Sequence, residues 1–124
     1  MTDRPHNLAA AAPPFFGAPK NPVSPEILQW WVDMLLQCPL KVLIELQRVF
    51  TETDFRAELR AIALPTLIVH GDNDTSTPLE LTGRKTAALI RGSQLKVYEG
   101  AAHGLPITHI TRLNADLLAF AKSI

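Results

Sequence analysis

The sequence predicts a single α/β domain, in which a helical first half precedes two parallel strands joined by a helix. A chain of 124 residues is long enough for one domain and too short for two. Residues 66–69 form a continuous, partly β-branched apolar run, the pattern of a strand buried on both faces of a parallel sheet. A helical pattern separates this run from a second apolar stretch at residues 95–98. Such a strand-helix-strand connection makes two neighbouring strands parallel.

The first region, residues 1–23, is predicted to be an irregular, Pro-rich approach segment. It holds five of the ten prolines of the chain, and a sixth, Pro25, follows just after it. Each proline removes a backbone donor and biases the preceding residue away from the helical conformation. We therefore expect no regular element before residue 24.

The second region, residues 24–60, is predicted to be helical. Ser24 and Pro25 suit the N-cap and first turn of a helix that ends near Pro39. A second helical stripe follows at once, and Thr53 is expected to cap a short turn after it. The apolar residues at helical spacing are Ile27, Trp30, Trp31, Met34 and Leu35 in the first stripe, then Leu40, Leu43, Ile44 and Phe50 in the second.

The third region, residues 61–124, is predicted to be strand, loop, helix, strand, loop, helix. Thr77, Pro78 and Glu80 suit the N-cap, first turn and capping box of a helix running to about Ile90. The last helix follows the second loop and presents one apolar face, made of Ile110, Leu113, Leu117, Phe120 and Ala121.

Composition argues against several classes of function. The 12 basic and 12 acidic residues balance, so the sequence offers no electrostatic case for a nucleic-acid or acidic-membrane partner. No apolar run approaches the ~20 residues that would span a bilayer, and none near the N-terminus is long enough for a secretory signal. The single cysteine, Cys38, is expected to be a buried small hydrophobe rather than a nucleophile. We expect a cytoplasmic protein.

Two loops hold the residues that could carry chemistry. Asp72 and Asp74 follow the first predicted strand, and His103 follows the second. Functional groups collect at the carboxyl ends of parallel strands, so a carboxylate and an imidazole should meet there. This pair is the orienting acid and general base of a nucleophilic triad.

The loop motifs extend into a longer pattern that resembles the C-terminal half of an α/β-hydrolase, most closely the non-haem haloperoxidase (perhydrolase) and esterase branch. The resemblance covers about residues 53–123 strongly and the helical first half more loosely. It is carried by T-D-F-R at 53–56, P-T-L-I-V-H-G-D-N-D at 65–74, E-G-A-A-H-G at 99–104, T-H at 108–109, and Asn114, Leu117, Leu118 and Phe120.

The resemblance implies the last two parallel strands of that fold with flanking helices, preceded by a helical lid. It implies that Asp74, the last residue of H-G-x-x-D, is the triad acid and that His103, in G-x-x-H-G, is the base. Asp72 is the rival carboxylate. The substrate would be a small ester or acyl compound, and the chemistry would need no cofactor and no metal.

The sequence departs from the family at the nucleophile. No G-x-S-x-G occurs, and the serines present lack the glycine-flanked turn that exposes a nucleophile. We therefore expect a truncated or split serine hydrolase that supplies acid and base but is inactive alone. Its partner would be a complementary N-terminal hydrolase half or a second copy. The serines are Ser24, Ser76, Ser93 and Ser123.

Other interpretations stay open. The chain could be a non-catalytic hydrolase remnant or an interaction module. A metal-dependent hydrolase is a weaker alternative, although a calcium loop starting at Asp72 fails because Thr77 and Gly83 occupy its glycine and glutamate positions. The metal alternative would use His70, Asp72, Asp74 and His103. His70 is otherwise expected to be structural, and His109 to lie at the surface or to support a site residue without touching the substrate. Trp30, Trp31 and Met34 are expected to be core or to line an acyl pocket.

Overall fold

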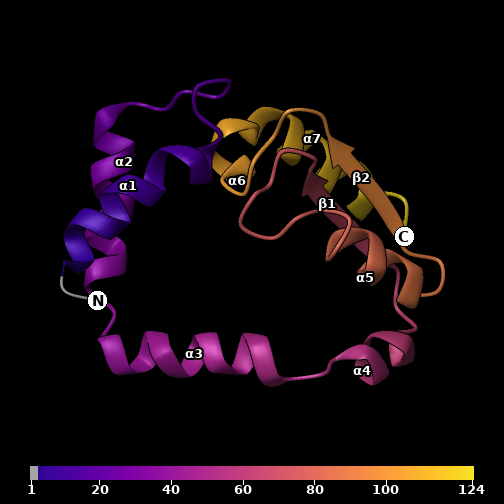
Figure 1. The fold of residues 1–124 in the computed structure, drawn as a ribbon. Coiled ribbons are helices and arrows are strands. Elements are labelled where there is room, and N and C mark those ends of the chain that lie inside the picture. Colours follow the sequence, from indigo (N-terminus) through magenta and orange to yellow (C-terminus); the bar gives the residue numbers. More distant parts are fainter. Residues whose placement is uncertain (1–2) are drawn as a thin grey trace.

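The computed structural model describes residues 3–124 and shows two groups of elements joined by a long helix. Helices α1 and α2 lie on one side of the molecule, and the strands with α5, α6 and α7 lie on the other (Figure 1). Helices α3 and α4 connect the two groups. In chain order the elements are α1 (Arg4–Phe16), α2 (Pro25–Leu36), α3 (Leu40–Glu52), α4 (Arg56–Ala61), β1 (Leu67–Gly71), α5 (Gly83–Leu89), β2 (Gln94–Tyr98), α6 (Leu105–Thr108) and α7 (Ile110–Ala121).

The two predicted strands form a parallel sheet, which confirms the α/β expectation. Their register pairs Leu67 with Gln94 at one end and Gly71 with Tyr98 at the other. The expectation that the first strand is buried on both faces is wrong for this structure, because residues 67–70 are only half-buried. Within residues 3–124 the sheet has two strands, so each strand has an edge without a neighbour.

The core lies between the sheet and the segment that follows it. Tyr98 is fully buried and packs with Ala101 and Leu105. Its hydroxyl donates to Asp116 Oδ2 at 2.6 Å, and Lys96 Nζ donates to Asp116 Oδ1 at 2.5 Å. Because Lys96 and Tyr98 are two residues apart, they share one face of β2, and both hold α7 against it.

The prediction of an irregular approach segment is wrong for residues 4–16, because these residues form α1. Asp3 caps this helix by accepting from the His6 N–H at 2.9 Å, and Pro5 stands in the first turn, where no N–H is needed. The two later prolines stand near the other end, where Gly17 closes the helix with φ 91°. Phe16, the last residue of the helix, is buried, so this end of the helix packs against the rest of the structure. The division of the chain into three regions stays a prediction.

The predicted helices of the second region are confirmed. Ser24 caps α2, its Oγ accepting from the Ile27 N–H at 3.3 Å. Helix α3 has no buried residue, and its apolar stripe is exposed. Among residues 3–124 no single helix is long and apolar enough to cross a membrane; α2 and α3 meet such a criterion only as a pair bent by 93°.

Two predicted helix caps differ from the structure. Asp54, not Thr53, accepts from the Arg56 N–H at the start of α4. Helix α5 begins at Gly83 rather than after Thr77, and residues 79–82 form a turn. The Thr77 hydroxyl instead donates to Asp74 Oδ2 at 3.0 Å, and Thr82 is the residue that directly precedes the helix.

Candidate active site

The carboxyl ends of the two strands touch, and this contact brings the two predicted loops together. A Cβ on Gly71, the last residue of β1, would lie 2.1 Å from the carbonyl oxygen of Ala101, so only glycine fits there. The N–H of Asn73 then donates to the same oxygen at 3.0 Å. The loop after β1 is thereby fixed against the loop after β2.

This contact places His103 beside Asp74. His103 Nδ1 lies 2.8 Å from Asp74 Oδ2. Asp74 is buried, with 7% of its surface exposed, whereas the His103 side chain is 40% exposed. Because an ionised carboxylate can only accept, Nδ1 carries the hydrogen and Nε2 keeps a free lone pair. The pair has the arrangement of an orienting acid and a general base.

The surroundings of Asp74 keep it ionised. Burial raises the pKa of this carboxyl, but hydrogen bonds from the Thr77 N–H, from His103 and from the Thr77 hydroxyl lower it by more, so the pKa lies below its ordinary value. Oδ1 also accepts from the Ser76 N–H at 2.9 Å. A carboxylate with these donors remains charged at neutral pH and can stabilise an imidazolium.

The rival carboxylate, Asp72, has a different partner. Its Oδ1 accepts from the Gly100 N–H at 2.6 Å, so it links the two loops away from His103. Geometry therefore pairs His103 with Asp74 and not with Asp72. Among residues 3–124, no group of three or more His, Cys, Asp or Glu side chains is arranged to hold a metal ion.

Two further histidines, His70 and His109, have hydrogen-bond partners of their own. His70 Nε2 lies 2.8 Å from the carbonyl oxygen of Thr77, and His109 Nδ1 lies 2.8 Å from Thr108 Oγ1. Cys38 is half-buried rather than buried. In the described part of the chain, the side-chain partners of the His103 ring are Asp74 and Thr77, and none of the serines is among them.

Thr77 is the residue that sequence reasoning missed as part of the site. Its hydroxyl lies 3.0 Å from Asp74 Oδ2 and 3.2 Å from His103 Nδ1. The signal was present in the sequence, because an aspartate followed within three residues by serine and threonine favours a turn closed on its own carboxylate. Thr77 also suits a helix N-cap followed by Pro78 and Glu80, and this is the role that the sequence analysis gives it.

An apolar hollow of about 320 Å³ opens beside His103 on the side of α1 and α2. The Phe15 ring lies 5.0 Å from the His103 ring and 4.8 Å from that of Trp31. Gly104 allows this approach, since a Cβ there would lie 2.4 Å from Phe16, and its N–H donates to the carbonyl oxygen of Phe15. The acyl-pocket interpretation fits three lining residues, Trp30, Trp31 and Met34.

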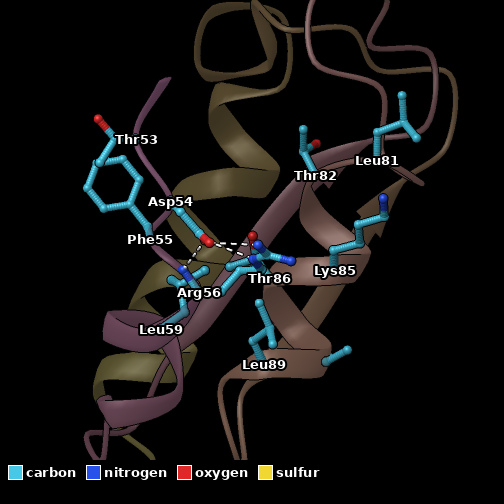
Figure 2. A pocket seen from close by; sticks show the side chains of 11 residues that line it. Thr53, Asp54, Phe55, Arg56, Leu59, Leu81, Thr82, Lys85, Thr86 and Leu89 are labelled. Carbon is cyan, nitrogen blue, oxygen red and sulfur yellow. Dashed lines mark hydrogen bonds and ion pairs between the residues drawn. The ribbon is translucent and has the colours of Figure 1, made fainter. Parts of the chain in front are cut away.

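A larger hollow, of about 610 Å³, lies between α4 and α5 (Figure 2). Its walls are mostly apolar, and the ion pair between Arg56 and Asp54, 2.6 Å long, stands at one side. Neither Asp74 nor His103 lines it. Size alone therefore does not mark the site, and the acid-base pair lies elsewhere.

Comparison with known proteins gives the pattern a family context. No protein-family model matches the sequence. A non-haem haloperoxidase of Rhodococcus erythropolis is 36% identical over 118 residues, which cover 94% of this chain and 43% of that protein. A bifunctional esterase/perhydrolase of Acinetobacter calcoaceticus is 38% identical over 121 residues, covering 95% of this chain and 43% of the relative.

Solved structures agree with these relatives. A bromoperoxidase of Bacillus anthracis matches with a TM-score of 0.90 and 34% identity, over 97% of this chain and 44% of that one. An esterase of Exiguobacterium antarcticum matches with a TM-score of 0.85 and 27% identity, over 98% and 44%. This chain thus spans less than half the length of the relatives it matches. It has the fold and the sequence pattern of the C-terminal half of an α/β-hydrolase of the non-haem haloperoxidase and esterase branch.

Proposed function

We propose that this chain supplies the acid and the base of a serine hydrolase acting on carboxylic esters, and that a serine from an N-terminal hydrolase segment completes the site. The observation that carries the proposal is the 2.8 Å contact between His103 Nδ1 and the buried, multiply hydrogen-bonded carboxylate of Asp74. This contact fixes the ring with Nε2 free to take a proton. The names of the relatives, haloperoxidase and esterase/perhydrolase, support the same class of reaction.

The proposed chemistry follows from the roles of these two groups. His103 Nε2 takes the proton of the serine hydroxyl while the serine oxygen attacks the ester carbonyl, and Asp74 stabilises the resulting imidazolium. The imidazolium then gives this proton to the departing alcohol, which leaves an acyl-serine. In the second half, His103 takes a proton from water while the oxygen of that water attacks the acyl-serine. The imidazolium then returns this proton to the serine oxygen as its bond to the acyl carbon breaks, which releases the carboxylic acid and restores the serine and the base.

Perhydrolysis needs one change in this scheme. When hydrogen peroxide takes the place of water in the second half, the acyl group is released as a peracid. No metal or other cofactor takes part in either step. The hollow next to Phe15 and Trp31 would hold the acyl group, and its apolar lining favours an uncharged one.

The test restores the proposed missing component. The chain is fused to an N-terminal α/β-hydrolase segment that carries G-x-S-x-G, and hydrolysis of a short-chain aryl ester is measured. His103→Ala and Asp74→Asn should each lower kcat by about 10³–10⁴-fold. Asp72→Asn is the matched control, because this carboxylate faces Gly100, and it should have little effect.

Two results would overturn the proposal. One is an Asp72→Asn variant that remains folded and loses more activity than Asp74→Asn. The other is a fused protein in which neither His103→Ala nor Asp74→Asn lowers kcat, which would favour the remnant or interaction-module alternative.

A further inference from the structure

A third side chain closes a triangle with the acid-base pair. Thr77 Oγ1 lies 3.0 Å from Asp74 Oδ2 and 3.2 Å from His103 Nδ1, while these last two atoms are 2.8 Å apart. The hydroxyl therefore contacts both members of the pair from one side. Because β1 and β2 supply the two loops, the triangle stands at the carboxyl end of the sheet.

The hydrogens of this triangle can be assigned by elimination. Asp74 is ionised and accepts only, so the two groups within hydrogen-bond distance of Oδ2 on this triangle, Thr77 Oγ1 and His103 Nδ1, must donate to it. His70 Nε2 lies farther from the same oxygen, at 3.5 Å. The single hydroxyl hydrogen of Thr77 is used in this way, and the Nδ1 hydrogen of His103 is used likewise. The Nδ1 hydrogen of His103 points mainly at Asp74, so the oxygen of Thr77 accepts only a second, weaker hydrogen bond from it. The longer distance of 3.2 Å between Thr77 Oγ1 and His103 Nδ1 agrees with this.

The backbone of Thr77 is held as firmly as its side chain. Its N–H donates to Asp74 Oδ1 at 2.9 Å, and its carbonyl oxygen lies 2.8 Å from His70 Nε2 and accepts from the Thr82 hydroxyl at 3.2 Å. A carbonyl only accepts, so His70 carries a hydrogen on Nε2. His70 in turn packs on Gly83, where a Cβ would lie 2.6 Å from its Nδ1.

We propose that Thr77 is a positioning residue of the acid-base pair: its hydroxyl holds the Asp74 carboxylate and the His103 ring in one orientation, with His70 anchoring Thr77 from behind. The proposal rests on the proposed function. It assigns no contact with substrate to Thr77.

The experiment compares three variants of the fused protein. Thr77→Val keeps the branched shape and removes the hydroxyl, Thr77→Ser keeps the hydroxyl, and Thr75→Val changes an exposed neighbour two residues away. Losing one hydrogen bond to a charged group should lower kcat by about ten-fold to a hundred-fold in Thr77→Val, with little change in KM. Thr77→Ser should restore most of kcat, and Thr75→Val should leave it unchanged.

A second readout does not depend on turnover. The carboxyl carbon of Asp74 is titrated by NMR in the same proteins. The pKa of Asp74 should rise in Thr77→Val, because a hydrogen bond that lowers it is lost, and it should stay low in Thr77→Ser and Thr75→Val. A purely structural role for Thr77 would not produce this dependence on the hydroxyl.

The outcomes separate this proposal from the one on which it rests. An unchanged Asp74 titration in Thr77→Val overturns the positioning role, as does a Thr77→Ser variant as impaired as Thr77→Val. If instead His103→Ala and Asp74→Asn leave the fused protein fully active, the proposed function fails, while the Asp74 titration still decides whether Thr77 holds the carboxylate.

Discussion

Replacing Tyr98 with Phe should destabilise the fused protein, because it removes one hydrogen bond and leaves the buried ring in place. The lost bond is the 2.6 Å contact from the hydroxyl to Asp116 Oδ2. Hydrogen bonds to charged groups contribute about 1.5–3 kcal/mol. Asp116 keeps its contact with Lys96 and is 20% exposed, so water can replace part of the loss. We therefore expect the free energy of unfolding to fall by about 1–2 kcal/mol.

The same change should alter the pH dependence of stability. Burial, followed by the hydrogen bond to Asp116, raises the pKa of Tyr98 to about 12 from its ordinary value of 10.0. As the pH rises, the unfolded chain therefore loses the Tyr98 proton at a lower pH than the folded protein does. The contribution of Tyr98 to the free energy of unfolding is complete below pH 10 and is lost as the pH rises towards 12. Tyr98→Phe should lack this component of the alkaline loss.

Urea unfolding at pH 7 and from pH 9 to 11.5 measures both effects. A double-mutant cycle with Asp116→Ala isolates the contact, since the coupling between the two positions should account for most of the Tyr98→Phe effect. The reasoning would be refuted by a loss below about 0.3 kcal/mol at pH 7, or by equal alkaline loss in the two proteins.

Three other outcomes are expected. The chain alone should hydrolyse aryl esters no faster than a protein-free control, since Asp74 and His103 provide no serine nucleophile; chelator-resistant activity abolished by a serine-directed inhibitor would contradict this. Alone it should also associate or melt without cooperativity, because the sheet has unpaired edges and Phe50 is 77% exposed. Sedimentation and melting at several concentrations test this, and a monomer with one sharp, concentration-independent transition would contradict it. In the fused protein, Gly104→Ala should push α1 off the His103 loop and change tryptophan emission, and an unchanged emission spectrum would contradict this.

The choice of Asp74 over Asp72 as the partner of His103 followed from the family resemblance, and the contact between Asp74 and His103 agrees with it. The sequence itself was sufficient to predict the parallel strands and the helices α2, α3 and α7. Each of these depends on local signals, such as a continuous apolar run or a serine before proline, that agree with the tertiary structure. The half-burial of β1 was not predictable from its apolar run, because that pattern describes a strand covered on both faces, whereas residues 67–70 are only half-buried here.

Helix α1 was mispredicted because prolines were counted without regard to their position in the helix. Pro5 suits a first turn, where no backbone donor is needed. Pro13 and Pro14 lie inside the helix near its end, where each removes a backbone donor and crowds the preceding turn. Burial of Phe16 against Gly104 favours the helix, and this contact spans almost ninety residues of sequence. No local pattern reports a contact of that range, so the tertiary structure overrides the propensity.

The acid-base pair is specified by a short part of the chain. Gly71 lets the two loops touch, Asp72 ties the first loop to Gly100, and Thr77 fixes the carboxylate, all within residues 70–104. The apolar hollow depends instead on α1 and α2, which reach His103 through the contact at Gly104. The orientation of His103 and the selectivity for the acyl group should therefore respond to different substitutions. Changes at Thr77 should lower kcat for every ester, whereas changes in α2 should mainly alter the relative kcat/KM values of different esters.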